Sequence, residues 1–387
     1  KLSHVDGRAG QLIIGGYDLS EFAGRVSFEE AAHLLWRGAL PSKHERTSLR
    51  REIAELRALP DEALHVLKAA TRTPPIDALR MACATLSLDV ANPDDVSPEA
   101  DFAHAMILTA RFPTVVAAHA RIASGQEPIP PRSDLSLAAN FLYMVQGKEP
   151  DPIVARALDT YWVTVIDHGM NASTFAARVI ASTRSDMVSA VTGAIGALKG
   201  PLHGGAPGPV LDMLQDIRSA DRAAAWVRNE LGAGRRIMGM GHRIYRVRDP
   251  RAEALEHAAS ILERDGFAVD RVTLAHAVER EAERLLAERH PERPLRANVE
   301  FYTAVLLEAV GIPRSLFSPT FAVSRVAGWC ARYDEQRRRG PVLRAASLYN
   351  LPPPPAGHAA PLHAPTRPPT ESAGARSAAP SAGGRSR

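Results

Sequence analysis

The stretch GALKGPLHGGA, residues 196–206, joins a helical pattern to a histidine between glycines. Before it, apolar residues recur at the spacing of one helix face, at Met187, Val191, Ala194, Ile195 and Leu198. The pair Gly200-Pro201 then predicts the end of that helix. His203 is therefore expected on a loop, followed by two glycines that let a ligand approach the backbone closely.

A second stretch, GMGHRIYRVRDPR at residues 239–251, places another histidine after a glycine. Asp249-Pro250 favours a helix start, with Asp as the N-cap and Pro at the first helical position. His242 then lies on the loop before this helix, and Arg251 falls in its first turn. Arginine binds carboxylates in a bidentate manner, so Arg251 is a candidate ligand for an anion.

These loop residues together favour a site for a small polyanion. Histidine titrates near neutrality, so His203 and His242 fit the roles of general acid or hydrogen-bond donor. Asn298 is a candidate cap for a further helix, and Glu300 in its first turn is a candidate base.

Each residue also has a structural interpretation without function. The two histidines can be exposed or internally hydrogen-bonded, Arg251 can be solvated, and Glu300 can serve only the helix dipole. Arg325 and Arg344 carry no signal alone. Spacing alone therefore predicts an α-helical enzyme or a binding protein for an anionic ligand.

Helical periodicity dominates the chain. Besides the helices named above, it predicts helices at 28–37, 45–58, 61–70, 76–86, 99–111, 114–124, 134–146, 151–165, 208–216 and 220–231. Strand signals are weak apart from Gln11–Ile14.

Composition excludes several classes of protein. The 387 residues are 45% hydrophobic and 23% charged, as in ordinary globular domains. Cys83 and Cys330 have apolar neighbours, which predicts buried thiols rather than a disulfide or a metal site. There is no apolar run of about 18 residues, so we expect no transmembrane span and a cytoplasmic location.

The last 36 residues, 352–387, differ from the rest. Pro, Ala, Gly and Ser make up 26 of them, which predicts a disordered tail. The tail holds four Arg and one Glu, so it accounts for +3 of the formal net charge of +4. The remaining body is nearly neutral, which argues against nucleic-acid binding.

The motifs together resemble the citrate synthase family, in the bacterial form shared with 2-methylcitrate synthase. The resemblance runs from about Val5 to Tyr349. It rests on VDGRAG (5–10), SFEEAAHLLWRGALP (27–41), NFLYMVQGKEPD (140–151), DHGMNASTF (167–175), GALKGPLHGGA (196–206), GHRIYRVRDPRA (241–252), NVEFYTAVLLEAVGIP (298–313) and FAVSRVAGWCARYDEQ (321–336).

The resemblance implies a mainly α-helical fold and a homodimer. It implies a large domain at 1–209 and 307–351, and a small closing domain at 210–306. It further implies an acyltransferase of the tricarboxylic acid cycle that condenses acetyl-CoA with oxaloacetate and hydrolyses citryl-CoA, without metal or cofactor. Expected partners are these two substrates and a second copy of the chain, and neither nucleic acid nor membrane.

The resemblance also assigns roles to the catalytic candidates. His203 matches the histidine that holds the thioester oxygen while the enol forms, and His242 matches the histidine that polarises the oxaloacetate carbonyl. Glu300 matches the general base, which is usually Asp in this family. Glu adds one methylene, roughly 1.5 Å of reach, and a misplacement of about 1 Å can cost about 100-fold in rate. We expect the backbone to be adjusted to Glu.

The substrate-binding residues follow in the same way. His168, Arg251 and Arg325 match residues on oxaloacetate, and Arg344 resembles an arginine that reaches in from the other subunit. Arg246 matches a basic residue near the coenzyme A phosphates. No motif separates acetyl-CoA from propionyl-CoA. A paralogue that binds CoA esters or dicarboxylates with little turnover and a citryl-CoA cleaving enzyme are also compatible with these motifs.

Overall fold

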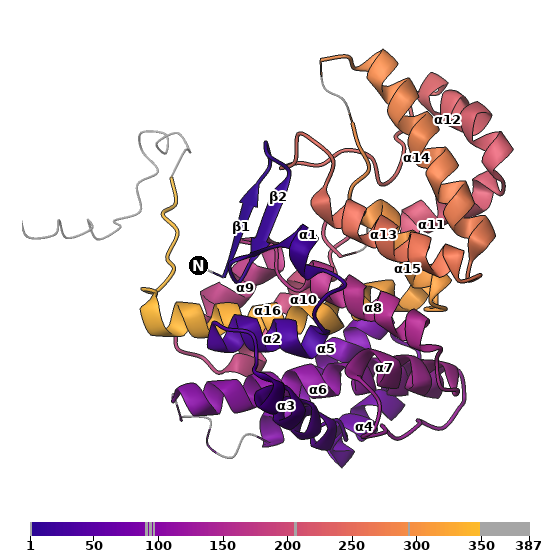
Figure 1. Ribbon diagram of the computed structural model, residues 1–387. Coiled ribbons are helices and arrows are strands. Elements are labelled where there is room, and N and C mark those ends of the chain that lie inside the picture. Colours follow the sequence, from indigo (N-terminus) through magenta and orange to yellow (C-terminus); the bar gives the residue numbers. More distant parts are fainter. Residues whose placement is uncertain are drawn as a thin grey trace, which may run out of the picture. The chain divides into compact units, whose positions relative to one another are not determined.

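The computed structural model describes residues 2–89, 92, 95, 97–204, 207–292 and 295–348. The described residues up to 343 form one compact unit, shown in Figure 1, and residues 344–348 lie outside it. The tail predicted at 352–387 lies outside the described residues. The division of the compact unit into a large and a small domain stays a prediction.

Helices account for most of the described chain, which confirms the mainly α fold. The helices are α1 (Leu19–Phe22), α2 (Phe28–Arg37), α3 (Lys43–Glu55), α4 (Asp61–Ala69), α5 (Pro75–Thr85), α6 (Pro98–Ala123), α7 (Leu137–Gln146), α8 (Pro152–Val165), α9 (Ala172–Ser182), α10 (Met187–Leu198), α11 (Pro207–Ile217), α12 (Ala223–Gly232), α13 (Pro250–Arg264), α14 (Val269–Arg289), α15 (Val299–Ala309) and α16 (Phe317–Arg339). The strands are β1 (Ser3–Asp6), β2 (Gln11–Ile14) and β3 (Tyr17–Asp18).

Side-chain caps fix the helix starts that position the site. Asp249 caps α13 by accepting a hydrogen bond from the Arg251 amide, and Asn298 caps α15 by accepting one from the Glu300 amide. The predictions for these helices and for α10 are therefore confirmed. The prediction of two separate helices at 99–111 and 114–124 was wrong, because these residues form one helix, α6, with Pro113 inside it. Burial of α6 around Pro113 keeps the helix continuous despite the missing N–H.

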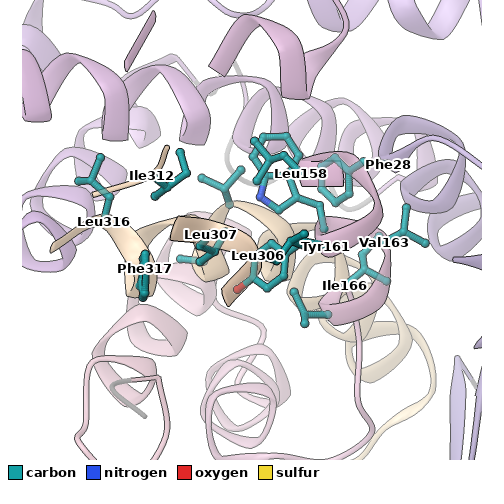
Figure 2. Packing of buried hydrophobic residues seen from close by; sticks show 14 of the residues in the cluster. Phe28, Leu158, Tyr161, Val163, Ile166, Leu306, Leu307, Ile312, Leu316 and Phe317 are labelled. Carbon is teal, nitrogen blue, oxygen red and sulfur yellow. The ribbon is translucent and has the colours of Figure 1, made fainter. Parts of the chain in front are cut away.

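Helix α16 runs through the core of the compact unit. It packs against α2, α6, α8, α9 and α10, and its residues from Val323 to Tyr333 are all buried. Figure 2 shows another part of the core, where Leu306 and Leu307 of α15 meet Leu158 and Tyr161 of α8. These contacts connect the helix of Glu300 to the body of the molecule.

The three short strands form an antiparallel sheet in the order β1-β2-β3. Ser3 pairs with Ile14 and Asp6 with Gln11, so β1 and β2 form a tight hairpin that projects from the helices in Figure 1. The sequence predicted β2 alone.

The two cysteines are free and buried, as predicted. Among the helices that the structure describes, none is long and apolar enough to cross a membrane.

Candidate functional site

The loop that carries His242 is hydrogen-bonded to the start of the helix that carries Glu300. The Asn298 amide donates to the Gly239 carbonyl at 2.9 Å, and Asn298 Nδ2 donates to the Gly241 carbonyl at 2.7 Å. Both glycines have positive φ, and a Cβ at Gly239 would lie 2.8 Å from a side-chain atom of α15. The two candidate catalytic residues are therefore held together by backbone contacts that only glycine permits.

Asp249 fixes the orientation of Arg251. Its carboxylate is fully buried and accepts from Arg251 Nε at 3.0 Å and from Nη2 at 2.8 Å. It also accepts from the Val299 amide at 3.2 Å, which joins the starts of α13 and α15. Arg251 thus stays charged, and both Asp249 and burial restrict its guanidinium to one geometry.

Two hydrogen bonds define the tautomer of His242. The amides of Ile244 and Tyr245 both donate to Nδ1 at 3.0 Å, so in the neutral ring Nε2 carries the proton. Burial, aided by Arg251, lowers the pKa of His242 to about 4, so the ring is neutral at pH 7. His242 Nε2 and Arg251 Nη2, 3.2 Å apart, are then both donors. We call them the donor pair, since one oxygen can accept from both.

His168 lies beside this donor pair. Its ring centroid is 6.1 Å from that of His242, and its Nε2 is 3.1 Å from the Tyr245 hydroxyl. Burial holds the pKa of His168 well below its ordinary range, and the positive charges of Arg251 and Arg325 add to this effect. His168 is therefore neutral and can act as a hydrogen-bonding group.

His203 is oriented by the first turn of α9. The Ser173 amide points at His203 Nε2 at 3.4 Å, and the Ser173 hydroxyl lies 2.8 Å from the same nitrogen. Because an amide can only donate, Nε2 is the acceptor and Nδ1 carries the proton. Trp329 Nε1 donates to the Ser173 hydroxyl at 3.2 Å. Burial lowers the pKa of His203 to about 4, so Nδ1–H is a neutral donor.

Arg325 provides a buried positive charge from α16. Its Nε donates to the Val165 carbonyl at 2.7 Å, and its guanidinium carbon lies 4.6 Å from the centre of the Phe321 ring. The ring of His203 makes an edge-to-face contact with the same Phe321 ring, at 6.4 Å between the ring centroids. Burial lowers the pKa of Arg325 to about 10, which leaves it charged at neutral pH.

Glu300 is the candidate carboxylate that interacts electrostatically with Arg251 and Arg325. The residues that the structure describes give its side chain no hydrogen bond, and it is half-buried. Burial raises its pKa to about 7, while the charges of Arg251 and Arg325 oppose that rise. The helix start alone therefore does not keep Glu300 fully ionised at neutral pH.

Two predicted site residues are not joined to this set by any hydrogen bond among the described residues. Arg246 has an exposed side chain, and its amide donates to the Gly7 carbonyl at 2.7 Å. Arg344 is exposed and lies outside the compact unit. Their roles stay predictions.

Sequence reasoning missed several residues that shape the site. Ser173 orients His203, Phe321 lies against both Arg325 and His203, and Tyr245 contacts both His168 and His242. Asn171-Ala-Ser173 at a helix start was the available signal, because Asn is a common N-cap. The sequence around Phe321 and Tyr245 has no feature that distinguishes them from ordinary core residues.

This geometry suits the removal of a proton followed by carbon–carbon bond formation. Glu300 can accept a proton, His203 Nδ1–H can stabilise a developing oxyanion, and the donor pair can polarise a second carbonyl. No group of three or more His, Cys, Asp or Glu residues in the described part could hold a metal ion.

Comparison with known proteins supports the same chemistry. Residues 1–346 match the family model described as citrate synthase, C-terminal domain. The chain is 40% identical over 355 residues to the citrate synthase of Haloferax volcanii, covering 90% of this chain and 92% of that protein. It is 37% identical over 349 residues to the 2-methylcitrate synthase of Mycobacterium tuberculosis, covering 90% and 86%. The crystal structure of citrate synthase from Pyrobaculum aerophilum superposes with a TM-score of 0.83 at 35% identity, covering 91% and 89%.

Proposed function

This chain belongs to the citrate synthase family of acyltransferases, and from that premise we propose that it condenses acetyl-CoA with oxaloacetate and hydrolyses the citryl-CoA formed. The observation that carries the proposal is one carboxylate, Glu300, which has no side-chain hydrogen bond among the described residues and interacts electrostatically with Arg251 and Arg325, together with two separate sets of neutral or cationic donors. One set is His203 Nδ1–H, and the other is the donor pair of His242 and Arg251.

The first step forms an enolate. Glu300 in its ionised form takes a proton from the acetyl methyl group, and the electron pair of the C–H bond moves toward the thioester oxygen. His203 Nδ1–H donates a hydrogen bond to that oxygen, where negative charge develops. A neutral imidazole N–H suits this role, because it is a very weak acid and so donates the hydrogen bond while keeping its proton.

The second step joins the two substrates. The enolate carbon attacks the oxaloacetate carbonyl carbon, and the carbonyl electrons move to its oxygen, which accepts hydrogen bonds from the donor pair of His242 and Arg251. This oxygen then takes up a proton and becomes the hydroxyl group of citryl-CoA, and Glu300 releases the proton that it removed from the methyl group. Arg251, Arg325 and His168 bind the carboxylates of oxaloacetate. Water then attacks the citryl thioester, the C–S bond breaks, and CoA leaves as the thiol while citrate remains.

A thiol-release assay tests this proposal. With oxaloacetate, acetyl-CoA should release free CoA at a rate that is lost in Glu300→Gln and in His203→Ala. Faster release with propionyl-CoA would instead favour a 2-methylcitrate synthase, since one methylene is worth only about 1–3 kcal/mol of discrimination.

A catalytically weak paralogue and a citryl-CoA lyase would each give a different result in the same assay. Binding of oxaloacetate or CoA esters without thiol release would favour the weak paralogue. Cleavage of added citryl-CoA to oxaloacetate and acetyl-CoA, without condensation, would favour a lyase built on this fold.

The proposal includes a homodimer, in which Arg344 of one subunit completes the site of the other. It includes closure of residues 210–306 over the substrates, with Arg246 near the coenzyme A phosphates. A role in the tricarboxylic acid cycle and a cytoplasmic location are also proposed, and no metal or cofactor takes part.

A further inference from the structure

One short strand, β1, is hydrogen-bonded to both histidine segments of the oxaloacetate region. Its first residue, Ser3, contacts the segment of His168, and the residue after its end, Gly7, contacts the loop of His242. The strand spans four residues, which at about 3.3 Å per residue is about 13 Å.

The Ser3 hydroxyl uses its full hydrogen-bonding capacity. It donates to Asp167 Oδ2 at 2.6 Å and accepts from the Gly169 amide at 3.0 Å and from Arg332 Nη2 at 2.8 Å. Asp167 and Gly169 flank His168, and Asp167 is fully buried. Ser3 therefore ties the backbone on both sides of His168 to one end of β1.

Gly7 contacts the other segment through its backbone. Its carbonyl accepts from the Arg246 amide at 2.7 Å, and a Cβ at this position would lie 2.3 Å from the Ile244 carbonyl oxygen. Gly10, across the turn, is equally close to the same loop, since its Cβ would lie 2.5 Å from Val247 Cγ2. The turn of the hairpin is thus seated on the residues that follow His242.

The hairpin is held in place along its length. Four residue pairs join β1 to β2, and Leu12 and Ile14 of β2 are fully buried. Strand β1 is therefore a fixed part of the molecule rather than a flexible connection between its two ends.

We propose that β1 is a spacer that sets the separation of His168 and His242 once residues 210–306 have closed over the substrates, and that Ser3 and Gly7 are positioning residues for the dicarboxylate bound between them. The ring centroids of the two histidines lie 6.1 Å apart, so a small shift of either segment changes the geometry of a shared ligand. The identity of that ligand, oxaloacetate, rests on the proposed function.

Substitutions at the two ends of β1 test this proposal in the full chain. Ser3→Ala removes the hydroxyl, and Gly7→Ala adds the Cβ that meets the Ile244 carbonyl. Gly7 does not have a positive φ, so alanine there tests the close approach and not backbone strain. Arg8→Ala is the matched control, because its side chain is exposed in the same turn.

Calorimetry should measure the dissociation constants of oxaloacetate and of acetyl-CoA separately. We expect both variants to weaken oxaloacetate binding about tenfold, which corresponds to the weakening of about one hydrogen bond to a charged carboxylate. Acetyl-CoA binding should not change, Ser3→Thr should restore oxaloacetate binding, and Arg8→Ala should match the parent. Folded Ser3→Ala and Gly7→Ala chains with parental affinity for oxaloacetate would overturn the proposal. If Gly7→Ala does not fold, the oxaloacetate affinities of Ser3→Ala and Ser3→Thr alone test the proposal.

Hydrogen exchange separates this proposal from the proposed function. If the parent chain binds no oxaloacetate, the proposed function fails. Amide hydrogen exchange of residues 242–248 then tests separately whether β1 holds the loop of His242. Faster exchange there in Gly7→Ala, with parental exchange in Arg8→Ala, supports the spacer. Unchanged exchange in Gly7→Ala contradicts it.

Discussion

The protonation of Glu300 should control the pH dependence of the reaction. Burial raises its pKa to about 7, and the base must be ionised to take the methyl proton. We expect kcat/KM for acetyl-CoA to fall about tenfold per pH unit below pH 7 and to level off above it. His203 and His242, with pKa values of about 4, should add no inflection between pH 5 and pH 8.

A pH–rate profile at saturating oxaloacetate checks this expectation. In the variant Glu300→Gln, most of the rate should be lost, and the remaining rate should no longer fall as the pH is lowered below 7. A midpoint near the ordinary glutamate value of 4.5 would show that the carboxyl is better solvated than the structure indicates.

The same residue should reduce stability at neutral pH. Glu300 has a pKa of about 7 in the folded chain and an ordinary value of 4.5, so the folded state holds a proton that the unfolded state has lost between these values. Stability from this residue is therefore fully present below about pH 4.5 and falls as the pH rises to 7. The values differ by about 2.5, and each pKa unit corresponds to about 1.4 kcal/mol, which gives about 3 kcal/mol.

Glu300→Gln removes the charge and keeps the shape, so it should stabilise the protein above pH 7 by an amount of this order. Urea unfolding at pH 8 and at pH 4.5 measures the difference, which should nearly vanish at pH 4.5. Equal stability of parent and variant at pH 8 would show that the ionised side chain finds partners that offset its burial.

At the scale of the structural elements, one side chain in the loop before α13, Arg248, connects this loop to the neighbouring helices. Its Nη2 donates to Glu279 of α14 at 2.7 Å, and its Nη1 lies 2.8 Å from Glu256 of α13. Its guanidinium carbon is 5.8 Å from the ring of Tyr302 on α15, and the Tyr302 hydroxyl also donates to Glu279. Arg248 thus joins three helices directly beside Asp249, which orients Arg251.

Replacing this arginine should leave Glu279 as a buried carboxylate that has lost its ion pair and keeps the hydrogen bond from the Tyr302 hydroxyl. Breaking a buried ion pair costs about 3–5 kcal/mol, and partial exposure of Arg248 reduces this to about 2 kcal/mol. We expect Arg248→Met to lose that much stability in urea unfolding. Arg243→Met, on the same loop with an exposed side chain, is the control. Adding Glu279→Gln to Arg248→Met should recover part of the loss, and a double variant weaker than either single one would refute the pairing.

Helices that begin with a recognisable N-cap residue could be predicted from the sequence, and some helices without one could not. Asp249 and Asn298 are strong N-caps, so α13 and α15 were predicted at their true starts. Helix α14 was not predicted, because it begins at Ala268, which has a positive φ and no side-chain cap. Helix α16 is buried over most of its surface, so its sequence lacks the two-faced pattern that identifies a helix at the surface.

For the candidate site, the sequence could identify residues with a local signal but not those whose role depends on tertiary packing. His203, His242 and Glu300 stood out because each lies beside a glycine or a helix start, and the family resemblance supplied their roles. Ser173 and Phe321 could not be identified in this way, since their effects depend on which helices pack together. The raised pKa of Glu300 could not be predicted either, because burial outweighs the effect of the helix start and cannot be inferred from local sequence.

At the scale of the whole molecule, the candidate site draws on distant parts of the chain. His168, His203, His242 and Glu300 come from four segments, and Arg325 comes from α16. Hydrogen bonds between segments far apart in the sequence, such as Ser3 to Asp167, hold them in one unit. Arg344 follows that unit, in the part of the chain where a contribution to a second subunit is predicted.

Mixing two inactive chains tests whether Arg344 completes the site of a partner. In a dimer of Arg344→Ala with His203→Ala, one site combines an intact His203 with the partner's intact arginine, and the other site lacks both. Random mixing makes half of the dimers mixed, so about a quarter of the parental thiol release should return, because a symmetric dimer has two equivalent sites. A mixture of His203→Ala with Glu300→Gln should recover nothing, since both groups are expected from the same chain. Failure of the first mixture in verified mixed dimers would mean that each site is built within one subunit, and Arg344 would then have no part in it.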